Sequence, residues 1–256
     1  MNHKTIVILS GGMDSTTLLW QLKNEGHNLH AVSFNYGQRH LKELDCARRQ
    51  CEALQIDHTV LDLKPIFGEF LASCSVLIET KGEVKQIPEG HYADLNMKAT
   101  VVPNRNMILL SLATGFGLSH TPEGWGLKVA YGAHEGDHDI YPDCRSTFVM
   151  SMREVLAKCD WKPVELLTPF IGMTKGQIVR QGIRLGVQYD ATWSCYKGEA
   201  RACGRCGTCV ERLEAFASQG FDDPLGYEDR LYWTEVSKVK LPDGVIVGEG
   251  GFLKML

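Results

Sequence analysis

A glycine-rich loop near the N-terminus has the residue types of an anion-binding turn. Residues 10–15 read SGGMDS and lie between an apolar run at 5–9 and a stretch with helical periodicity. Gly11 and Gly12 allow a sharp turn and a close approach to a ligand, and unpaired amides at the start of the helix would bind phosphate. Asp14 fits beside phosphate as a ligand of magnesium. The residues that we expect to bind a nucleotide are Ser10, Gly11, Gly12, Asp14 and Ser15.

Other nucleotide-binding motifs are absent from the sequence. Neither GxxxxGK[ST] nor a full GxGxxG followed by an acidic residue occurs in the chain. Their absence argues against a GTPase-type hydrolase and against a dinucleotide-binding enzyme. The alternative for SGGMDS is a turn that joins a strand to a helix and binds nothing, but the length and position of the motif disfavour it.

Four of the nine cysteines crowd into fifteen residues, which favours a metal site. Cys195, Cys203, Cys206 and Cys209 follow the spacing C-x7-C-x2-C-x2-C. Four thiolates would close a tetrahedral shell, so we expect a structural zinc rather than a catalytic one. An iron–sulfur cluster and a redox pair are the alternatives, because C-x2-C-x2-C also occurs in cluster proteins, and unliganded cysteines are a third.

The elements that must position these groups alternate between strands and helices. Strands are predicted at 5–9, 30–34, 58–63 and 127–131, and helices at 15–25, 41–54, 104–119, 145–158, 174–186 and 210–218. This alternation predicts an α/β fold with a doubly wound parallel sheet. Residues 74–100 lack periodicity and are interpreted as a long loop, for which a mobile lid is one hypothesis. The last thirty or so residues are predicted to be irregular.

Composition narrows the class of protein. The chain has 256 residues, of which 44% are hydrophobic and 23% charged, with a net charge of −4. A nucleic-acid-binding surface is disfavoured because the basic residues are dispersed. No apolar run approaches the about 20 residues of a membrane helix, and the N-terminus is too short for a signal peptide. We expect a cytoplasmic protein with mostly reduced cysteines.

Several motifs resemble those of a known family, the QueC family of 7-cyano-7-deazaguanine synthases. The loop SGGMDS resembles the SGGxDS loop of the PP-loop ATP pyrophosphatases, to which that family belongs. The other motifs are FNYGQRH at 34–40, VPNRN at 102–106, YPDCR at 141–145 and TWSCY at 192–196. The resemblance runs from about residue 5 to about residue 216, and four motifs in the right order make chance agreement implausible.

The resemblance implies a fold, an activity and cofactors. The fold would be the PP-loop, adenine nucleotide alpha hydrolase-like type, with a small zinc-bearing helical region at the C-terminus. The activity would be that of an ATP-dependent ligase that forms C–N bonds in queuosine biosynthesis. It would adenylate 7-carboxy-7-deazaguanine, form an amide with ammonia, and activate the amide again to give the nitrile preQ0. ATP, Mg²⁺ and a zinc on the four cysteines are implied, as is a homodimer.

Eight residues are the candidates for substrate contacts and catalysis: Gln38, Arg39, Arg105, Asp137, Tyr141, Asp143, Lys175 and Trp193. One of the aspartates would accept hydrogen bonds from the N–H edge of a guanine-like ring, and one of the aromatic residues would stack on it. Arg105 and Lys175 would hold a carboxylate or phosphates. Gln38 and Arg39 follow the second predicted strand, at the edge where ligands bind such sheets. A purely structural role is the alternative for the aromatic residues and both arginines.

The sequence departs from the family pattern at a few positions. Asn104 stands where the family often has glycine, and asparagine tolerates the left-handed conformation. Residues 136–140 and 146–148 differ from many members, so the acceptor amine stays open. His134 and His138 in this region offer a second metal site as a minority alternative to a substrate-lining loop. The tail at 220–256 lies beyond the resemblance.

Three other functions compete with nitrile synthesis. A sibling ligase would adenylate the same acid and transfer it to another amine, for example on a protein encoded in an anti-phage operon. A tRNA-modifying thiolase shares the loop but would need catalytic cysteines and a basic surface. A zinc-bearing interaction module would need a degenerate loop, whereas Asp14 and both glycines are intact. We divide the chain into an α/β nucleotide-binding domain over 1–190 and a zinc-binding segment, helix and tail over 191–256.

Overall fold

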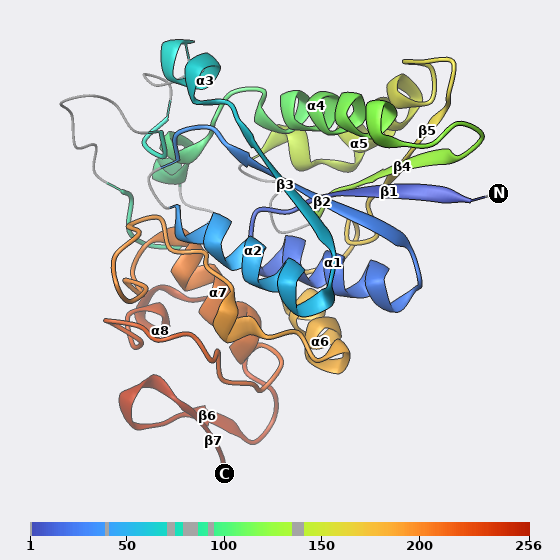
Figure 1. The fold of residues 1–256 in the computed structure, drawn as a ribbon. Helices are drawn as coiled ribbons and strands as arrows, with labels where there is room; N and C mark the ends of the chain where they lie inside the picture. Colours follow the sequence, from blue (N-terminus) through green and yellow to red (C-terminus); the bar gives the residue numbers. More distant parts are fainter. Residues whose placement is uncertain (1, 39–40, 71–74, 79–86, 92–94, 135–140) are drawn as a thin grey trace.

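The computed structural model describes residues 2–38, 41–70, 75–78, 87–91, 95–134 and 141–256. Within these residues, five parallel strands form a central sheet in the order β3-β2-β1-β4-β5 (Figure 1). They are β1 (His3–Ile8), β2 (Asn28–Asn35), β3 (Asp57–Asp62), β4 (Gly126–Ala130) and β5 (Val164–Leu167). The predicted doubly wound parallel sheet is confirmed. The edge strand β5 escaped prediction because four residues are too few to show a period.

Helices cover both faces of the sheet because the chain winds outward from β1 in two directions. Right-handed crossovers place the connecting helices of the two halves on opposite faces. One face packs against α1 (Met13–Asn24), α2 (Lys42–Leu54) and α6 (Lys175–Leu185), and the other against α4 (Arg105–His120) and α5 (Ser146–Leu156) (Figure 1). A short helix, α3 (Lys64–Phe70), follows β3. None of the helices that the structure describes is long and apolar enough to cross a membrane.

Three helix ends follow the local signals in the sequence. Thr174 and Gln177 form a reciprocal capping box at the start of α6, and Gly186 ends that helix with a left-handed φ of 78°. Asn104 precedes α4 with φ 58° and ψ 18°. The prediction that asparagine replaces glycine in a left-handed turn at this position is therefore confirmed.

The segment 74–100, predicted as a loop, is described only in part. Its last six residues, Leu95–Thr100, form a 3₁₀ helix, and the Val76 amide donates to the Ala99 carbonyl. The other short 3₁₀ helices are Pro142–Cys144, Tyr189–Ala191 and Glu249–Gly251. Residues 74, 79–86 and 92–94 of the proposed lid lie outside the described residues.

The C-terminal region packs on the α6 side of the sheet (Figure 1). It contains α7 (Gly207–Ala217), α8 (Trp233–Val236) and an antiparallel hairpin of β6 (Val245–Val247) with β7 (Leu253–Met255). The prediction of an irregular tail was wrong for α8, β6 and β7, which are too short for periodicity to reveal, whereas the helix predicted at 210–218 is found as α7. Residues from both sides of position 190, among them Val179 and Phe216, share one apolar cluster. The tail therefore rests on the α/β layer.

Candidate active site

A cavity of about 240 Å³ lies where β1 and β4 end. These strands flank the point at which the strand order reverses, and parallel α/β sheets bind ligands in the crevice there. The loop after β1 contributes Ser10, Gly12 and Asp14 to the lining, and the segment after β4 contributes Gly132 and Ala133. The glycine-rich loop found in the sequence therefore forms one wall of this cavity.

The loop is held in a turn that only glycine can adopt at position 11. Gly11 has φ 88°, and a Cβ atom there would lie 1.9 Å from the Glu43 carbonyl oxygen. The Oγ atoms of Ser10 and Ser15 are 2.9 Å apart, and the Ser10 amide donates to Ser15 Oγ at 3.1 Å. This bracing fixes the N-terminus of α1 at the cavity, with the amides of its first turn available to an anion.

Asp14 is the acidic residue that the glycine-rich loop contributes to the cavity lining. Its Oδ2 atom lies 3.4 Å from Lys175 Nζ and 3.5 Å from His134 Nε2. Burial alone would raise the pKa of Asp14, but the charges of Lys175 and His134 outweigh it and hold the pKa well below its usual range. Its Oδ1 atom is buried and accepts no hydrogen bond from the residues that the structure describes. A buried carboxylate oxygen of this kind is suited to a cation.

Lys175 links Asp14 to α7. Its Nζ donates to Glu211 Oε2 at 2.5 Å, so the ammonium group lies between two carboxylates. Lys175 is the first residue of α6, which the capping box fixes. The lysine thus sits at the cavity, where it can reach a phosphate or carboxylate once a ligand competes with Glu211.

Two further charged residues, Glu43 and Arg105, line the same cavity. Glu43 comes from the first turn of α2 and Arg105 is the first residue of α4. Burial raises the pKa of Glu43 to about 8, against the attraction of Arg105. The Tyr36 hydroxyl interacts with Arg105. Arg105 was predicted from the sequence and Glu43 was not, although Glu43 stands just after the motif at 34–40 in the first turn of a predicted helix.

Two of the predicted substrate residues, Gln38 and Asp143, make hydrogen bonds that stabilise the fold and do not line the cavity. Gln38 accepts from the Tyr36 amide at 2.9 Å and donates to the Phe34 carbonyl at 3.0 Å, which ties the turn after β2. Asp143 accepts from the Asn106 amide at 3.0 Å and so caps α4. Among the described residues, the cavity lining includes neither of these side chains.

The two candidate stacking residues are buried next to the cavity. The Tyr141 hydroxyl lies 2.8 Å from Thr100 Oγ1 and 3.4 Å from the Tyr196 hydroxyl. Trp193 Nε1 donates to the Cys195 carbonyl at 2.9 Å. Neither ring is among the described residues that line the cavity. Two further candidates, Arg39 and Asp137, fall outside the part of the chain that the structure describes, as does His138.

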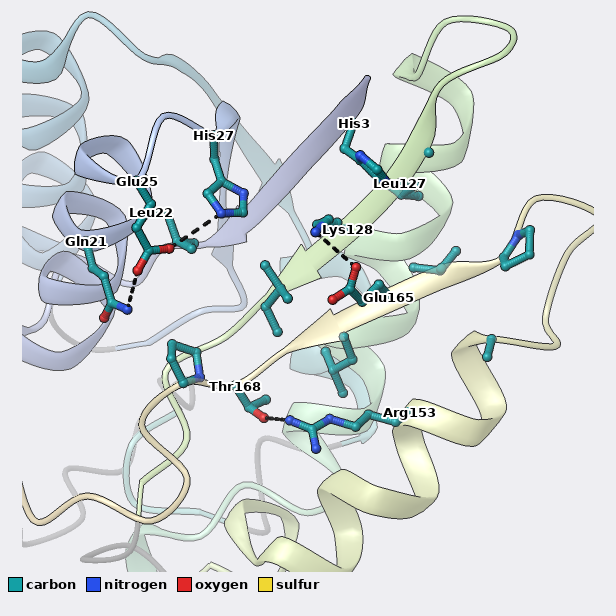
Figure 2. Close-up of a pocket in the computed structure, with 17 residues that line it drawn as sticks. His3, Gln21, Leu22, Glu25, His27, Leu127, Lys128, Arg153, Glu165 and Thr168 are labelled. Carbon is teal, nitrogen blue, oxygen red and sulfur yellow. Dashed lines mark hydrogen bonds and ion pairs between the residues drawn. The ribbon is translucent and has the colours of Figure 1, made fainter. Parts of the chain in front are cut away.

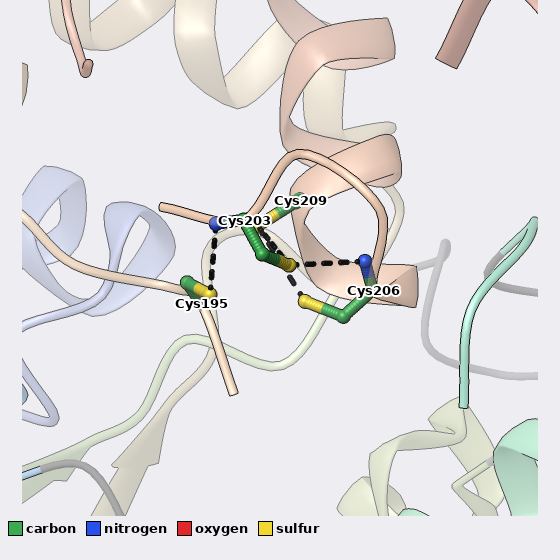
Figure 3. A group of neighbouring side chains, drawn as sticks. All are labelled: Cys195, Cys203, Cys206 and Cys209. Carbon is green, nitrogen blue, oxygen red and sulfur yellow. Dashed lines mark hydrogen bonds between the residues drawn. The ribbon is translucent and has the colours of Figure 1, made fainter. Parts of the chain in front are cut away.

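The four clustered cysteines meet in space (Figure 3). Their Sγ atoms all lie within 4.8 Å of one another, with 3.5 Å between those of Cys206 and Cys209. Hydrogen bonds, first from the Cys195 thiol and then from the others, lower the pKa of Cys203 below its usual range. The amides of Arg205 and Cys206 also donate to Cys203 Sγ. Buried thiolates gathered in this way can hold a metal ion.

The cysteine segment braces the glycine-rich loop. The Trp193 amide donates to the Gly11 carbonyl at 3.1 Å. Thr208 Oγ1 donates to the Ser194 carbonyl at 2.8 Å, and both residues line the cavity. These hydrogen bonds join the cysteine segment directly to the residues that line the cavity.

A larger groove of about 830 Å³ lies beside β5 and the start of β1, away from the loop (Figure 2). Its charged groups face one another, as Lys128 Nζ and Glu165 Oε2 do at 3.0 Å. Arg153 donates to Thr168 Oγ1 at 2.7 Å. Because these polar groups satisfy one another, the smaller cavity is the better candidate for the active site despite its size.

Fold and site together define an α/β protein with an anion-binding loop at the switch point of its sheet and a four-cysteine group beside that loop. The family model described as "Queuosine biosynthesis protein QueC" matches residues 4–220. The chain belongs to the QueC family, as the motifs in its sequence predicted. Residues 221–256 lie beyond the match.

Curated relatives support this assignment. A 7-cyano-7-deazaguanine synthase of Caldicellulosiruptor saccharolyticus is 48% identical over 232 residues, which cover 91% of this chain and 99% of the relative. A synthase of the same name from Hahella chejuensis is 52% identical over 226 residues, 88% of this chain and 94% of the relative. The U34-tRNA thiolase NcsA of Methanococcus maripaludis aligns at 15% identity with TM-score 0.47, covering 77% of this chain and 62% of that chain. The family match and the two synthases, and not this weak structural likeness, show that the chain is an enzyme of the QueC family.

Proposed function

We propose that this enzyme converts 7-carboxy-7-deazaguanine and ammonia to 7-cyano-7-deazaguanine at the expense of ATP. The observation that carries the proposal is the match to synthases of that name over nearly their whole length. The cavity supplies what the reaction needs, since a carboxylate becomes a good electrophile only after its oxygen joins a phosphate leaving group. The proposed sequence is adenylation of the acid, attack of ammonia to give the amide, and a second activation that removes water to give the nitrile.

The loop residues have distinct roles in this proposal. The amides of the first turn of α1 and the hydroxyls of Ser10 and Ser15 bind the pyrophosphate part of ATP. Gly11 and Gly12 keep side chains out of the phosphate path. Lys175 neutralises charge on the phosphates and leaves Glu211 to do so. The α-phosphorus stays open to the substrate carboxylate.

Asp14 is suited to hold magnesium. Its orphaned Oδ1 atom and its low pKa give an ionised oxygen donor of the kind that magnesium prefers. Bound there, the ion would offset the negative charge that develops on the phosphates. The rest of the site acts through its own residues, with Lys175 and the helix amides placed around the same anion.

We propose that the four cysteines hold one zinc ion with a structural role. Thiolates on a zinc ion at about 2.3 Å lie about 3.8 Å apart, close to the 3.5 and 3.9 Å between sulfur atoms of Cys206–Cys209 and Cys203–Cys209. A four-iron cluster binds each thiolate through a different iron and would hold the sulfurs farther apart. Four protein ligands leave no position for substrate.

Metal analysis tests the zinc assignment. We expect a colourless protein with about one zinc per chain by elemental analysis. Cys206→Ser should lose the metal, whereas Cys159→Ser, at an exposed cysteine outside the group, should keep it. A brown protein containing iron and sulfide would contradict the assignment.

A single incubation tests the activity. The purified chain, 7-carboxy-7-deazaguanine, ATP, magnesium and ammonium should yield the nitrile by mass spectrometry together with AMP. An accumulated amide without nitrile would mean that the second activation does not occur. Consumption of ATP without either product would favour transfer of the acid to another amine, and ADP in place of AMP would contradict adenylation.

A further inference from the structure

The walls of the cavity divide into two chemically different parts. One part contains Asp14, Lys175 and the glycine-rich loop, which suit phosphates. The other contains Glu43 and Arg105, which come from α2 and α4 on opposite faces of the sheet (Figure 1). The proposed function accounts for the first part and leaves Glu43 without a task.

We propose that Glu43 and Arg105 form the subsite that recognises the pyrimidinone edge of the deazaguanine acid. This inference rests on the proposed function for the identity of the ligand. It assigns to Glu43 the role of the specificity-determining acceptor, and to Arg105 that of the donor beside it.

The fold fixes Glu43 in place at the cavity. The Glu43 carbonyl oxygen lies so close to Gly11 that a Cβ atom there would meet it at 1.9 Å. The first turn of α2 is thus pressed against the glycine-rich loop, and its carboxylate lines the same cavity as the loop. The Glu43 side chain therefore starts from a backbone position that the loop fixes.

Arg105 is held from two sides. Its Cζ atom lies 5.9 Å from the centre of the Tyr141 ring, and the Tyr36 hydroxyl interacts with it. These contacts fix a planar guanidinium group at the start of α4. Tyr141 was predicted to stack on the substrate. In the structure its buried ring instead packs near the Arg105 guanidinium group and supports it.

The chemistry of the two groups matches the edge of the ring. A 2-amino-pyrimidin-4-one offers two adjacent donors, a ring N–H and an exocyclic amine, and one carbonyl acceptor. A carboxylate accepts two parallel hydrogen bonds, and a guanidinium donates to a carbonyl. Apolar side chains, including Leu77, Leu109 and Tyr131, line the same cavity and offer surface to a flat ring.

Burial of Glu43 is consistent with recognition of a ligand by its carboxylate. Its pKa is raised to about 8 by burial, although Arg105 opposes the shift. Two N–H donors from a ligand would stabilise the ionised carboxylate that burial disfavours. Recognition of this kind discriminates strongly because a ligand without one of the two donors loses a hydrogen bond to a charged group.

Calorimetric binding of two acids to the full, metal-containing chain tests the inference. The probes are 7-carboxy-7-deazaguanine and its analogue without the 2-amino group. The wild type should bind the analogue roughly 10- to 100-fold more weakly, the range for one hydrogen bond to a charged group. Glu43→Gln should weaken binding of the parent acid by a similar factor and reduce the discrimination to about threefold or less, with unchanged affinity for ATP.

Two more variants keep the result interpretable. Glu52→Gln changes an exposed acid of the same helix and should behave as wild type. Glu43→Asp keeps the charge on a shorter side chain and should retain part of the discrimination. A circular dichroism melt of each variant shows whether the fold is intact.

The outcomes separate this inference from the proposed function. Full discrimination by Glu43→Gln would overturn the inference, as would a loss of ATP affinity with discrimination intact. Binding of both acids with the expected pattern but no nitrile in the activity assay would overturn the proposed function alone. No binding of the parent acid to the wild type would overturn both.

Discussion

Two neighbouring residues of α7 take part in buried charge clusters of opposite character. Glu211 accepts from Lys175, which also faces Asp14 in the cavity. Arg212, the next residue, donates from Nε and Nη2 to both oxygens of Asp223 in the tail, at 2.7 and 2.9 Å. Its remaining donors reach Thr192 Oγ1 and the Tyr189 carbonyl.

The difference lies in how fully each cluster satisfies itself. Asp223 also accepts from the Tyr227 hydroxyl at 2.6 Å and from the Leu225 amide, so the Arg212 cluster is complete. Asp14 keeps a buried oxygen that no described residue contacts by a hydrogen bond. Buried charge that is complete serves architecture, and buried charge that is incomplete marks the place of a ligand.

The largest effect is expected from Asp223→Ala. Removing this carboxylate leaves the fully buried Arg212 guanidinium uncompensated, at a cost of about 3–5 kcal/mol in the free energy of unfolding. Urea denaturation measures it, with Asp243→Ala at an exposed aspartate of the tail as a control that should change stability by less than about 0.5 kcal/mol. A loss below about 1 kcal/mol would show that the tail does not anchor α7.

The same pair should make stability sensitive to acid. Burial tends to raise the pKa of Asp223, but Arg212 and the hydrogen bonds to the carboxylate lower it overall. A lowered pKa contributes stability above the ordinary value of about 3.9, and this contribution is lost as the pH falls through the folded-state pKa. In Asp223→Ala this part of the acid sensitivity should be absent.

Asp14→Asn should have the opposite effect to Asp223→Ala, with a large loss of activity and a smaller loss of stability. The variant keeps the shape of the side chain and removes the charge proposed to hold magnesium, so turnover should fall by roughly 100- to 1,000-fold. The unfolding free energy should fall by less than in Asp223→Ala, because asparagine keeps the shape of the side chain and Lys175 keeps Glu211 as its partner. Steady-state rates and a denaturation curve test both parts.

Asp45→Asn, at an exposed residue of α2, is the matched control and should retain full activity. Near-normal turnover combined with a large loss of stability in Asp14→Asn would move Asp14 into the architectural class with Asp223. The contrast between the two clusters would then fail.

The sequence allowed prediction of features that depend on nearby residues. The turn at Gly11, the capping box of Thr174 and Gln177, and the left-handed Asn104 all arise within a few positions. The four cysteines also lie close enough in sequence for their spacing to predict convergence. For such features, local backbone preference and spacing carry the information.

Features that depend on packing between distant segments were not predictable. Glu43 lines the cavity because α2 presses on the loop, and Asp223 is buried because it meets Arg212. Conversely, Asp143 and Gln38 have the right polarity for substrate but cap α4 and tie a turn. Residue type indicates what a side chain can bind, and only the fold decides which partner reaches it first.

The smallest effect concerns Glu43, the acid proposed to recognise substrate at a cost in stability. Its pKa of about 8, raised by burial above the ordinary 4.5, means that the folded chain keeps a proton that the unfolded chain has lost. Stability from this site is therefore present at low pH and lost as the pH rises toward 8. Glu43→Gln cannot ionise, and without ligand its stability relative to wild type should rise by roughly 1 kcal/mol or more between pH 5 and pH 8. Unfolding free energies at the two pH values test this, with Glu52→Gln expected to show no such trend. A flat difference for Glu43→Gln would mean that the pKa of Glu43 is near its ordinary value in the folded chain, and Glu43 would then join Asp223 among the architectural acids.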